Sequence, residues 1–417
     1  MSTTTTQHTQ TAYKDTSIGK IPADWEVKRL GELGIFSKGK GILKNQVKEK
    51  GLPCIRYGEI YTSYDYVAQK FKSFIDEDVA KASKEINKGD VLFAGSGETV
   101  DEIGKSVAYL GELKAYAGGD VIVYSPNQDL VSSECLSYTL DLNSVRKQKR
   151  YMGQGNSVVH IYPSDLAKLQ IPLPPLPEQK RIAEVLSTWD QAIQLTEQLI
   201  RQKEQRKKWL MQNLLTGKMR LKGFSGEWKK IGAGEVFKSV AKKGYADEEL
   251  LSATQDKGMI PRTMLEGRVT MPTTGTEGFK LVKVGDFVIS LRSFQGGLEY
   301  SYYRGLVSPA YTVLKPKKPI SEEFYKQYFK SYDFIGHLAI AVIGIRDGKQ
   351  ISYDDFCTVK IPYPTIEEQT AIAEVLQTAD KEIELLKAKA EQLKEQKKGL
   401  MQQLLTGKLR LKNEIKV

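Results

Sequence analysis

The sequence predicts an α+β protein in which two similar mixed α/β domains are separated by two long helices. The helices are expected to pair as an antiparallel coiled coil, which gives the chain internal pseudo-two-fold symmetry. Three observations support this fold: a long internal repeat, a helical seam pattern inside each repeat, and strand-like patterning outside them. At 417 residues the chain also exceeds the roughly 250–300 residues that one core usually serves.

The internal repeat is the main signal. Residues 161–222 align with residues 351–412 without gaps at a constant offset of 190, and 30 of the 62 positions are identical. For example, Ile-Ala-Glu-Val-Leu begins at Ile182 and recurs at Ile372, and Leu-Leu-Thr-Gly-Lys begins at Leu214 and recurs at Leu404. The chain therefore alternates between a variable block and a repeat, twice.

Each repeat is expected to form one long helix, at about 178–215 and about 368–405. Prolines precede both starts, and acidic residues follow in the first turn, as suits a helix N-terminus. Gly217 and Gly407 stand where a left-handed C-terminal cap belongs. Each helix would be roughly 57 Å long at about 1.5 Å per residue.

Apolar residues in both helices recur at alternating spacings of four and three, which is the pattern of a coiled-coil seam. We expect pairing between the two helices, since so long and narrow a seam has little else to pack on. Parallel and antiparallel pairing are both possible, and each helix packed on its own domain is the alternative. The expected seam and docking residues are Ile182, Leu186, Trp189, Ile193, Leu210 and Leu214, with Ile372, Leu376, Ile383, Leu386, Leu393, Leu400 and Leu404.

Two heads are expected outside the repeats, at residues 18–160 and 223–350, after a disordered tail at 1–17 and with a final segment at 351–417. Both heads carry short runs of β-branched and aromatic residues between glycines, as strands do. Both also have a Lys, Gly and Asp before a strand, ending at Asp90 and Asp286, and a tryptophan near the start, Trp25 and Trp228. The heads are therefore expected to share a fold.

Composition narrows the class of partner. Lysine and arginine exceed aspartate and glutamate by 62 to 51, which favours an anionic partner without proving one. Three distant cysteines suggest reduced thiols in a cytoplasm. We expect no signal peptide, and no stretch approaches the roughly 20 apolar residues of a membrane span.

Clusters of basic, amide and aromatic side chains near glycines make both heads candidates for double-stranded DNA binding. Arginine, glutamine and asparagine read base edges, and lysine mostly contacts phosphates. The alternatives are that these residues form an ordinary solvated surface, or that the heads of a coiled-coil adaptor bind protein. The candidates are Lys38, Lys40, Lys44, Arg56, Tyr57, Gln154 and Asn156 in the first head, and Lys242, Lys243, Arg262, Arg292, Ser293, Gln295, Arg346 and Lys349 in the second.

Catalytic motifs are incomplete, so we expect no enzyme, no metal site and no cofactor of its own. Phe93-Ala94-Gly95-Ser96-Gly97 is similar to a methyl-donor loop, but the only Pro-Pro pair lacks the polar and aromatic neighbours of an amino-methyltransferase. Gly104-Lys105-Ser106 would need a glycine at position 99 to form a phosphate-binding loop, and Thr99 stands there. Scattered histidines and cysteines give no zinc spacing.

Taken together, the alternation of variable heads and repeated helices resembles the specificity subunit of type I restriction-modification systems. The segment Ile18–Val27 is similar to the family's opening, and Ile171–Gln179 is similar to the entry of its central helix. Leu-Leu-Thr-Gly-Lys-x-Arg-Leu resembles the helix exits. The second copy departs from the pattern, because Thr365 and Glu367 replace two prolines.

The resemblance implies that each head is a target-recognition domain that reads one half of a bipartite, asymmetric DNA site. The helices would set the spacer and dock modification subunits, typically two, which would bind S-adenosylmethionine and methylate adenine. A motor-nuclease restriction subunit would add cleavage. No membrane is involved, and the location implied is the cytoplasm.

Overall fold

The computed structural model describes residues 12–155, 158–265, 275–341 and 351–411. The chain forms two compact units. The first unit comprises residues 1–195 with 390–417, and the second comprises residues 196–389. Each unit therefore contains one head together with parts of both repeats.

The head of the first unit contains two sheets. The five-stranded sheet has the order β4-β13-β9-β11-β6, in which the first four strands are antiparallel neighbours and β6 runs parallel to β11. The four-stranded sheet has the order β7-β5-β12-β8. The strands are β4 (Gly34–Lys38), β13 (Val121–Pro126), β9 (Val91–Ala94), β11 (Ser106–Tyr109), β6 (Val67–Ala68), β7 (Ser73–Ile75), β5 (Leu52–Ile55), β12 (Ala115–Ala117) and β8 (Lys84–Ile86).

Short elements surround these sheets. Strand β1 pairs with β2, β3 with β15 and β10 with β14. Because β1 begins at Tyr13, regular structure starts inside the segment expected as a tail at 1–17. The elements are β1 (Tyr13–Thr16), β2 (Gly19–Pro22), β3 (Glu26–Arg29), β10 (Ser96–Gly97), β14 (Val159–His160), β15 (Gln170–Leu173), α1 (Leu30–Leu33), α2 (Tyr57–Thr62), α3 (Glu77–Ala82), α4 (Ser133–Thr139), α5 (Asn143–Met152), α6 (Pro163–Leu166) and the 3-10 turn η1 (Lys44–Gln46).

The head of the second unit repeats the plan of the first. Its four-stranded sheet has the order β17-β24-β21-β22, which matches β4-β13-β9-β11 strand for strand. Paired strands β16-β25, β18-β19 and β20-β23 lie beside it. The elements are β16 (Lys229–Gly232), β17 (Phe237–Val240), β18 (Leu251–Thr254), β19 (Gly258–Pro261), β20 (Lys280–Val282), β21 (Phe287–Ile289), β22 (Glu299–Tyr300), β23 (Gly305–Val307), β24 (Thr312–Pro316), β25 (Lys360–Tyr363), α8 (Ala233–Val236), α9 (Ser293–Gly296), α10 (Glu322–Tyr328), α11 (Tyr332–Ala341), α12 (Tyr353–Thr358) and η2 (Arg262–Met264).

The Lys-Gly-Asp markers form the same turn in both heads. Gly89 and Gly285 adopt left-handed φ values of 97° and 90°, which glycine alone tolerates freely. The carboxylate of Asp90 accepts the backbone N–H of Asn87 at 2.7 Å, and that of Asp286 accepts the N–H of Lys283 at 2.8 Å. The markers are therefore structural turns that start β9 and β21.

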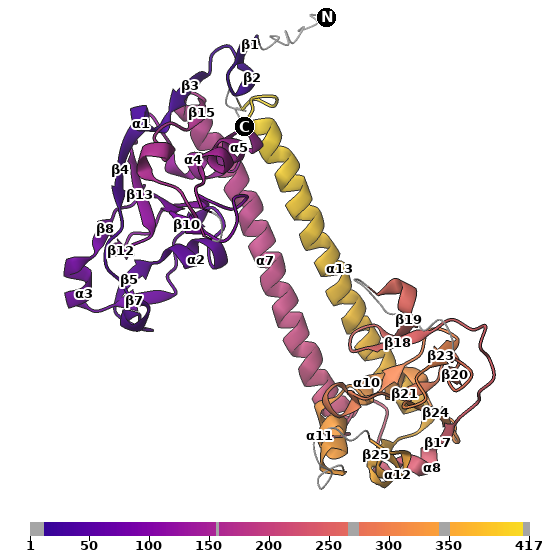
Figure 1. The fold of residues 1–417 in the computed structure, drawn as a ribbon. Coiled ribbons are helices and arrows are strands. Elements are labelled where there is room, and N and C mark those ends of the chain that lie inside the picture. Colours follow the sequence, from indigo (N-terminus) through magenta and orange to yellow (C-terminus); the bar gives the residue numbers. More distant parts are fainter. Residues whose placement is uncertain (1–11, 156–157, 266–274, 342–350, 412–417) are drawn as a thin grey trace, which may run out of the picture. The chain divides into compact units, whose positions relative to one another are not determined.

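The long helices are α7 (Leu176–Leu214) and α13 (Ile366–Leu404), each of 39 residues (Figure 1). In the first unit Asp190 of α7 pairs with Lys397 of α13. In the second unit Lys203 and Lys207 of α7 pair with Glu382 and Asp380 of α13. In the second unit, the residue numbers of the paired side chains increase along α7 as they decrease along α13. In the first unit, the start of α7 shares a core with the end of α13. Antiparallel pairing is therefore confirmed within each unit, and with it the predicted α+β class.

The helix ends also complete the cores of the heads. In the first unit Ile182 and Leu186 share a core with Trp25 and, from the other repeat, Met401 and Leu404. In the second unit Leu214 shares a core with Leu376 and Phe237. The alternative in which helices pack on a head therefore also holds, at the helix ends, alongside the pairing.

The seam residues follow the expected burial along most of both helices. The buried members are Ile182, Leu186, Ile193, Leu214, Ile372, Leu376, Ile383 and Leu404, and the half-buried members are Trp189, Leu210, Leu386, Leu393 and Leu400. Among the described residues, no helix is both long and apolar enough to cross a membrane.

Candidate nucleic-acid interface

In the first head, several chain segments meet at one edge of the five-stranded sheet. Strand β4 ends at Lys38 opposite Ile122, and β9 ends at Ala94 opposite Val121. The next residue, Gly39, donates its N–H to the carbonyl of Val121 at 2.7 Å. A Cβ at Gly39 would lie 1.8 Å from the carbonyl oxygen of Gly118. Glycine is thus required for a close backbone approach that brings Lys38 and Lys40, both exposed, to this edge.

Arg56 and Tyr57 reach the same region through the loop after β12. Gly118 donates to the carbonyl of Ile55 at 3.0 Å, and Lys40 donates its backbone N–H to Ala117 at 3.2 Å. Tyr57 is 42% exposed. Arg56 is half-buried and forms an ion pair with Glu59 at 3.2 Å. The structure therefore brings Lys40, Arg56 and Tyr57 together, with part of the Arg56 guanidinium already engaged.

Gln154 is brought to this edge by strand β14. It is exposed and exchanges backbone hydrogen bonds with His160, at 2.9 and 2.7 Å. His160 pairs with Ser96 just beyond the end of β9, and its Nδ1 lies 3.0 Å from the Ser96 hydroxyl. Lys44 is exposed in η1. Asn156 lies outside the described residues.

The second head presents the equivalent edge. Exposed Lys242 and Lys243 follow β17, and exposed Arg292 and Gln295 follow β21, its neighbour but one in the sheet. Lys280 joins them: burial lowers the pKa of its ammonium, and the positive charge of Lys243 lowers it further. Sequence patterning missed Lys280 because it stands alone in an apolar run. The two heads thus carry basic side chains at matching positions.

Some candidates of the second head occupy other positions. Ser293 departs from the expectation of an exposed contact, because it is fully buried and its hydroxyl accepts the N–H of Ser290 at 2.8 Å. It supports the turn that carries Arg292. Arg262 is half-buried in η2. Arg346 and Lys349 lie outside the described residues.

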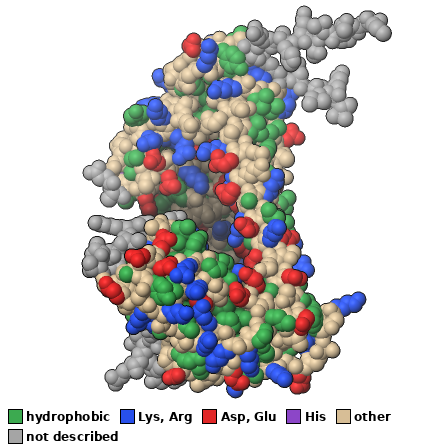
Figure 2. All heavy atoms as spheres, turned by 90° about the vertical axis from the view of Figure 1, so that its right-hand side faces the viewer, with side chains coloured by type: hydrophobic (Ala, Val, Ile, Leu, Met, Phe, Trp, Pro, Cys, Tyr) green, Lys and Arg blue, Asp and Glu red, His purple; other side chains and the backbone are tan. Residues whose placement is uncertain are grey.

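The surface of the second head is mixed in charge. In the lower half of Figure 2, lysine and arginine side chains gather in groups among hydrophobic ones, and acidic side chains are interspersed. The basic side chains thus form small groups and not one continuous basic face, as the modest excess of basic residues predicts. Phosphate contacts need only such local groups, because each is a short-range ionic interaction.

Both units contain a buried charge cluster that sequence reasoning missed. Trp25 Nε1 donates to Glu178 Oε2 at 3.1 Å, and the guanidinium of Arg410 donates to both oxygens of Glu178 at 2.8 Å. Burial alone would raise the pKa of Glu178, but the hydrogen bonds from Arg410 and Trp25 hold it below its ordinary value. The sequence does contain a signal for this cluster, since Glu178 and Arg410 each have an identical counterpart in the other repeat.

The equivalent cluster of the second unit joins Trp228, Glu368 and Arg220. Trp228 Nε1 donates to Glu368 at 2.9 Å, and Arg220 donates to both carboxylate oxygens, at 2.5 and 2.7 Å. In each unit, then, the arginine after one long helix holds the glutamate at the start of the other. These clusters position the heads and are not exposed recognition groups.

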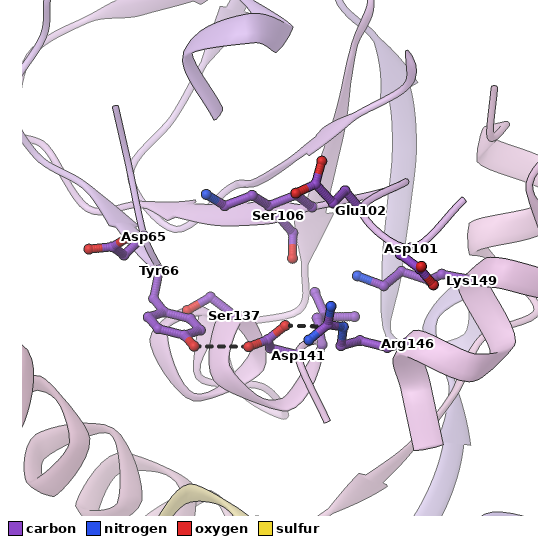
Figure 3. A pocket seen from close by; sticks show the side chains of 11 residues that line it. Asp65, Tyr66, Asp101, Glu102, Ser106, Ser137, Asp141, Arg146 and Lys149 are labelled. Atoms are coloured by element: carbon purple, nitrogen blue, oxygen red, sulfur yellow. Dashed lines mark hydrogen bonds and ion pairs between the residues drawn. The ribbon is translucent and has the colours of Figure 1, made fainter. Parts of the chain in front are cut away.

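The first head also contains a polar cavity of about 270 Å³. Figure 3 shows Ser106, Asp141 and Lys149 pointing into it from β11, the end of α4 and α5. Lys105 lines it too and donates to the carbonyl of Tyr61 at 3.2 Å. The Gly104-Lys105-Ser106 motif therefore forms a wall of this cavity and not a phosphate-binding loop.

Lys149 gives the cavity a testable dependence on pH. Its ammonium is buried and donates to the carbonyl of Gly104 at 2.9 Å, and burial lowers its pKa from 10.5 to about 8. Between these values the unfolded chain binds more protons than the folded chain, so stability rises with pH in that window. The full effect is on the order of 3 kcal/mol.

We expect the free energy of unfolding of the wild type, relative to that of Lys149→Met, to rise by about 2 kcal/mol between pH 7 and pH 9.5. Urea unfolding at both pH values measures it. Lys147→Met, which removes an exposed charge from the same helix, is the control and should show no such difference. Equal pH slopes in the wild type and Lys149→Met would contradict the assignment.

Two of the cysteines are buried, and the described parts of the chain hold no cluster of metal ligands. Burial raises the pKa of the Cys54 and Cys135 thiols to about 12, which leaves them protonated and unreactive at neutral pH. No group of three or more histidine, cysteine or acidic side chains within the described ranges could hold a metal ion.

Comparison with known proteins identifies relatives along the whole chain. The family described as the type I restriction modification DNA specificity domain matches residues 22–205 and again residues 225–395. The putative type I restriction enzyme MjaX specificity subunit of Methanocaldococcus jannaschii is 29% identical over 435 residues, covering 96% of this chain and 97% of the relative. The MjaVIII specificity subunit of the same organism is 27% identical over 423 residues, covering 94% and 95%.

A solved structure supports the fold. The crystal structure of the type I restriction-modification S subunit from M. genitalium superposes with a TM-score of 0.54 at 16% sequence identity, covering 91% of this chain and 96% of that one. At this identity the likeness concerns the fold alone. It agrees with two similar heads and two long helices.

Proposed function

Because the chain belongs to the type I restriction modification DNA specificity family, we propose that it aims a restriction-modification complex at one bipartite, asymmetric DNA site. As a member of that family it is a recognition protein and not an enzyme. Each head would read one half of the site, and the paired helices would set the unread spacer between the halves.

The observation that carries this proposal is the matched sheet edge in two heads of different sequence. In both heads exposed lysines stand at or just after the end of the first strand of the sheet order, Lys38 and Lys40 in one and Lys242 and Lys243 in the other, and the second head adds exposed Arg292 after its third strand. A shared frame with different loop residues is what two half-sites of different sequence require. An adaptor that binds protein would not need two such edges.

Two kinds of contact are proposed at these edges. Lys38, Lys40, Lys242 and Lys243 would contact phosphates and dock each head, and this affinity would fall steeply as salt rises. Arg292 and Gln295, with Gln154 of the first head, would contact base edges, since arginine pairs with guanine and glutamine with adenine.

Partners follow from membership of the family. Proteins of this class bind DNA and assemble with other subunits. We propose that this chain docks two modification subunits through the outer faces of α7 and α13, and works with a motor-nuclease restriction subunit. S-adenosylmethionine would bind the modification subunits, which must flip the target adenine out of the stack to methylate it. The site of action would be the cytoplasm.

The decisive experiment maps methylated adenines across the host genome with and without this gene. Loss of methylation at one motif of two short halves and a fixed gap would support the proposal and reveal the target. No change, with the gene and its partner subunits expressed, would favour the protein-binding adaptor.

Replacing Arg292 tests the assignment of base contacts. We expect Arg292→Ala to relax sequence preference at the second half-site by roughly 5- to 150-fold, since a bidentate arginine–guanine pair contributes about 1–3 kcal/mol of discrimination. Binding to duplexes with single substitutions in each half-site measures this. Lys243→Ala is the control, and it should weaken all sequences alike. Equal losses at both half-sites in Arg292→Ala would mark Arg292 as a phosphate contact.

A further inference from the structure

A lysine lies buried in the helix seam of the first unit, where an apolar residue would be expected. The side chain of Lys397 is 6% exposed. Its ammonium pairs with Asp190 of α7 and lies 4.0 Å from the ring centre of Tyr66 and 5.0 Å from that of Tyr138. Burial lowers the pKa of Lys397, and the carboxylate of Asp190 opposes that effect.

Both tyrosines belong to the first head and are themselves held in place. Tyr138 of α4 donates its hydroxyl to Asp190 at 2.7 Å. The hydroxyl of Tyr66, just before β6, donates to Asp141 at 2.9 Å, and Figure 3 shows this bond continuing to Arg146 at the edge of the polar cavity. The ammonium of Lys397, on α13, is therefore enclosed by two tyrosine rings of the head and by Asp190 of α7, and hydrogen bonds hold both rings in place.

The second unit contains a more exposed counterpart at the equivalent repeat positions, in which the side chains of Lys207 and Asp380 are 21% and 44% exposed. Lys207 occupies the position in the first repeat that Lys397 occupies in the second, and Asp380 likewise corresponds to Asp190. Lys207 and Asp380 form an ion pair. Asp380 accepts a hydrogen bond from Gln327 at 3.0 Å, and Gln327 lies on α10, the counterpart of α4. In each unit a head helix, an aspartate of one repeat and a lysine of the other meet at one point.

Stability does not explain the buried Lys397–Asp190 pair of the first unit. A buried ion pair costs desolvation energy, and apolar residues of similar volume often serve stability equally well. A buried polar pair does fix the position of the helix relative to the head, because a shift of one against the other would leave a charge unpaired in the core. The aromatic faces narrow that geometry further, since an ammonium is attracted to the ring face.

We propose that Lys397 is a positioning residue that holds the first head in one orientation on the helix pair and so makes the spacer strict. This inference rests on the proposed function. Adding one base pair to a spacer rotates one half-site by about 35° and moves it by about 3.4 Å. A head that could tilt on its helices would tolerate such a change, and a locked head would not.

The test uses the complete complex with its modification subunits, after the methylation map has given the motif and its spacer of n base pairs. Binding is measured to duplexes with spacers of n − 1, n and n + 1 base pairs. We expect Lys397→Met to reduce the preference for n over its neighbours by about tenfold. Lys397→Arg, which keeps the charge and the stacking, should retain that preference. Lys398→Met, at an exposed position of the same turn, is the matched control.

The outcomes separate the two proposals. If the wild type marks no bipartite site, the proposed function fails. If it prefers n and Lys397→Met binds all three spacers more weakly by one common factor, or unchanged, the lysine is merely structural and the inference is overturned. Should Lys397→Met not assemble, Tyr66→Leu is judged by the same ratio. It removes the ring face and the hydroxyl bond to Asp141 but keeps the Lys397–Asp190 pair, and a loss of strictness there supports the inference.

Discussion

Deleting residues 195–201 of α7 together with residues 386–392 of α13 is expected to abolish recognition at the native spacer. The two segments lie opposite each other in the antiparallel register that the Asp190–Lys397 and Lys207–Asp380 pairs define, so both pairs can still form. The deletion shortens each helix by about 10 Å, which corresponds to about three base pairs, and those turn the duplex by roughly 100°. We expect affinity for the native site to fall by at least about 100-fold while each head stays folded.

The control removes residues 195–201 from α7 alone. That change displaces one helix by a heptad against the other, so at most one of the two lysine–aspartate pairs can form, and the protein should unfold at a lower temperature. The double deletion should be the more stable of the two. A complex that contains the double-deletion protein and still methylates the native site normally would show that helix length does not set the spacer.

The long helices could be predicted because their signal is local and repeated. A seam at alternating spacings of four and three fixes the helix, and the gapless repeat fixes its second copy, so the expected starts near 178 and 368 lie within two residues of Leu176 and Ile366. Pairing direction could not be derived from periodicity. It depends on which charges meet, and Asp190 meets Lys397 only in the antiparallel arrangement.

The heads could be predicted from the sequence only in part. The Lys-Gly-Asp turns and the tryptophans correctly indicated a shared plan, because a left-handed glycine and a buried indole are local requirements. The residues of the proposed contact edge were predicted only in part. Exposed lysines near Gly39 and Lys242 were predicted from clustering, whereas Lys280 needed the β20 strand to bring it beside Lys243. Ser293 was misjudged because a hydroxyl in a polar loop can equally well turn inward.

The same limit explains why the anchoring clusters escaped notice. Glu178 and Arg410 are 232 residues apart, and pairing between them exists only once the end of the second repeat has returned to the first head. In sequence each is an ordinary charge beside a proline-rich start or after a helix cap. Only the repeat indicates that both charges are structural, because Glu368 and Arg220 occupy the positions that correspond to Glu178 and Arg410.

Arg410→Ala is therefore expected to destabilise the first unit by about 3–5 kcal/mol, the usual result of removing one partner from a buried ion pair. Its side chain is 8% exposed and that of Glu178 3%, so the variant leaves a carboxylate buried with only Trp25 to donate to it from the cluster. Urea unfolding gives the total loss, and hydrogen exchange in β3 and β15 shows that it falls in the first unit. Lys408→Ala, at an exposed position of the same terminal segment, should change little.

Two further variants decide between a lost charge pair and a lost side-chain contact. Arg220→Ala breaks the equivalent cluster, but Arg220 is 22% exposed, so water can partly solvate Glu368 and the loss should be smaller. Adding Glu178→Gln to Arg410→Ala removes the unpaired charge while keeping an acceptor for the Trp25 N–H, and it should recover more than half of the lost stability. No recovery would mean that Arg410 holds the segment after α13 in the first head through its packing and its bonds to Asp24, and not through the charge of Glu178, since only that charge differs between the two proteins.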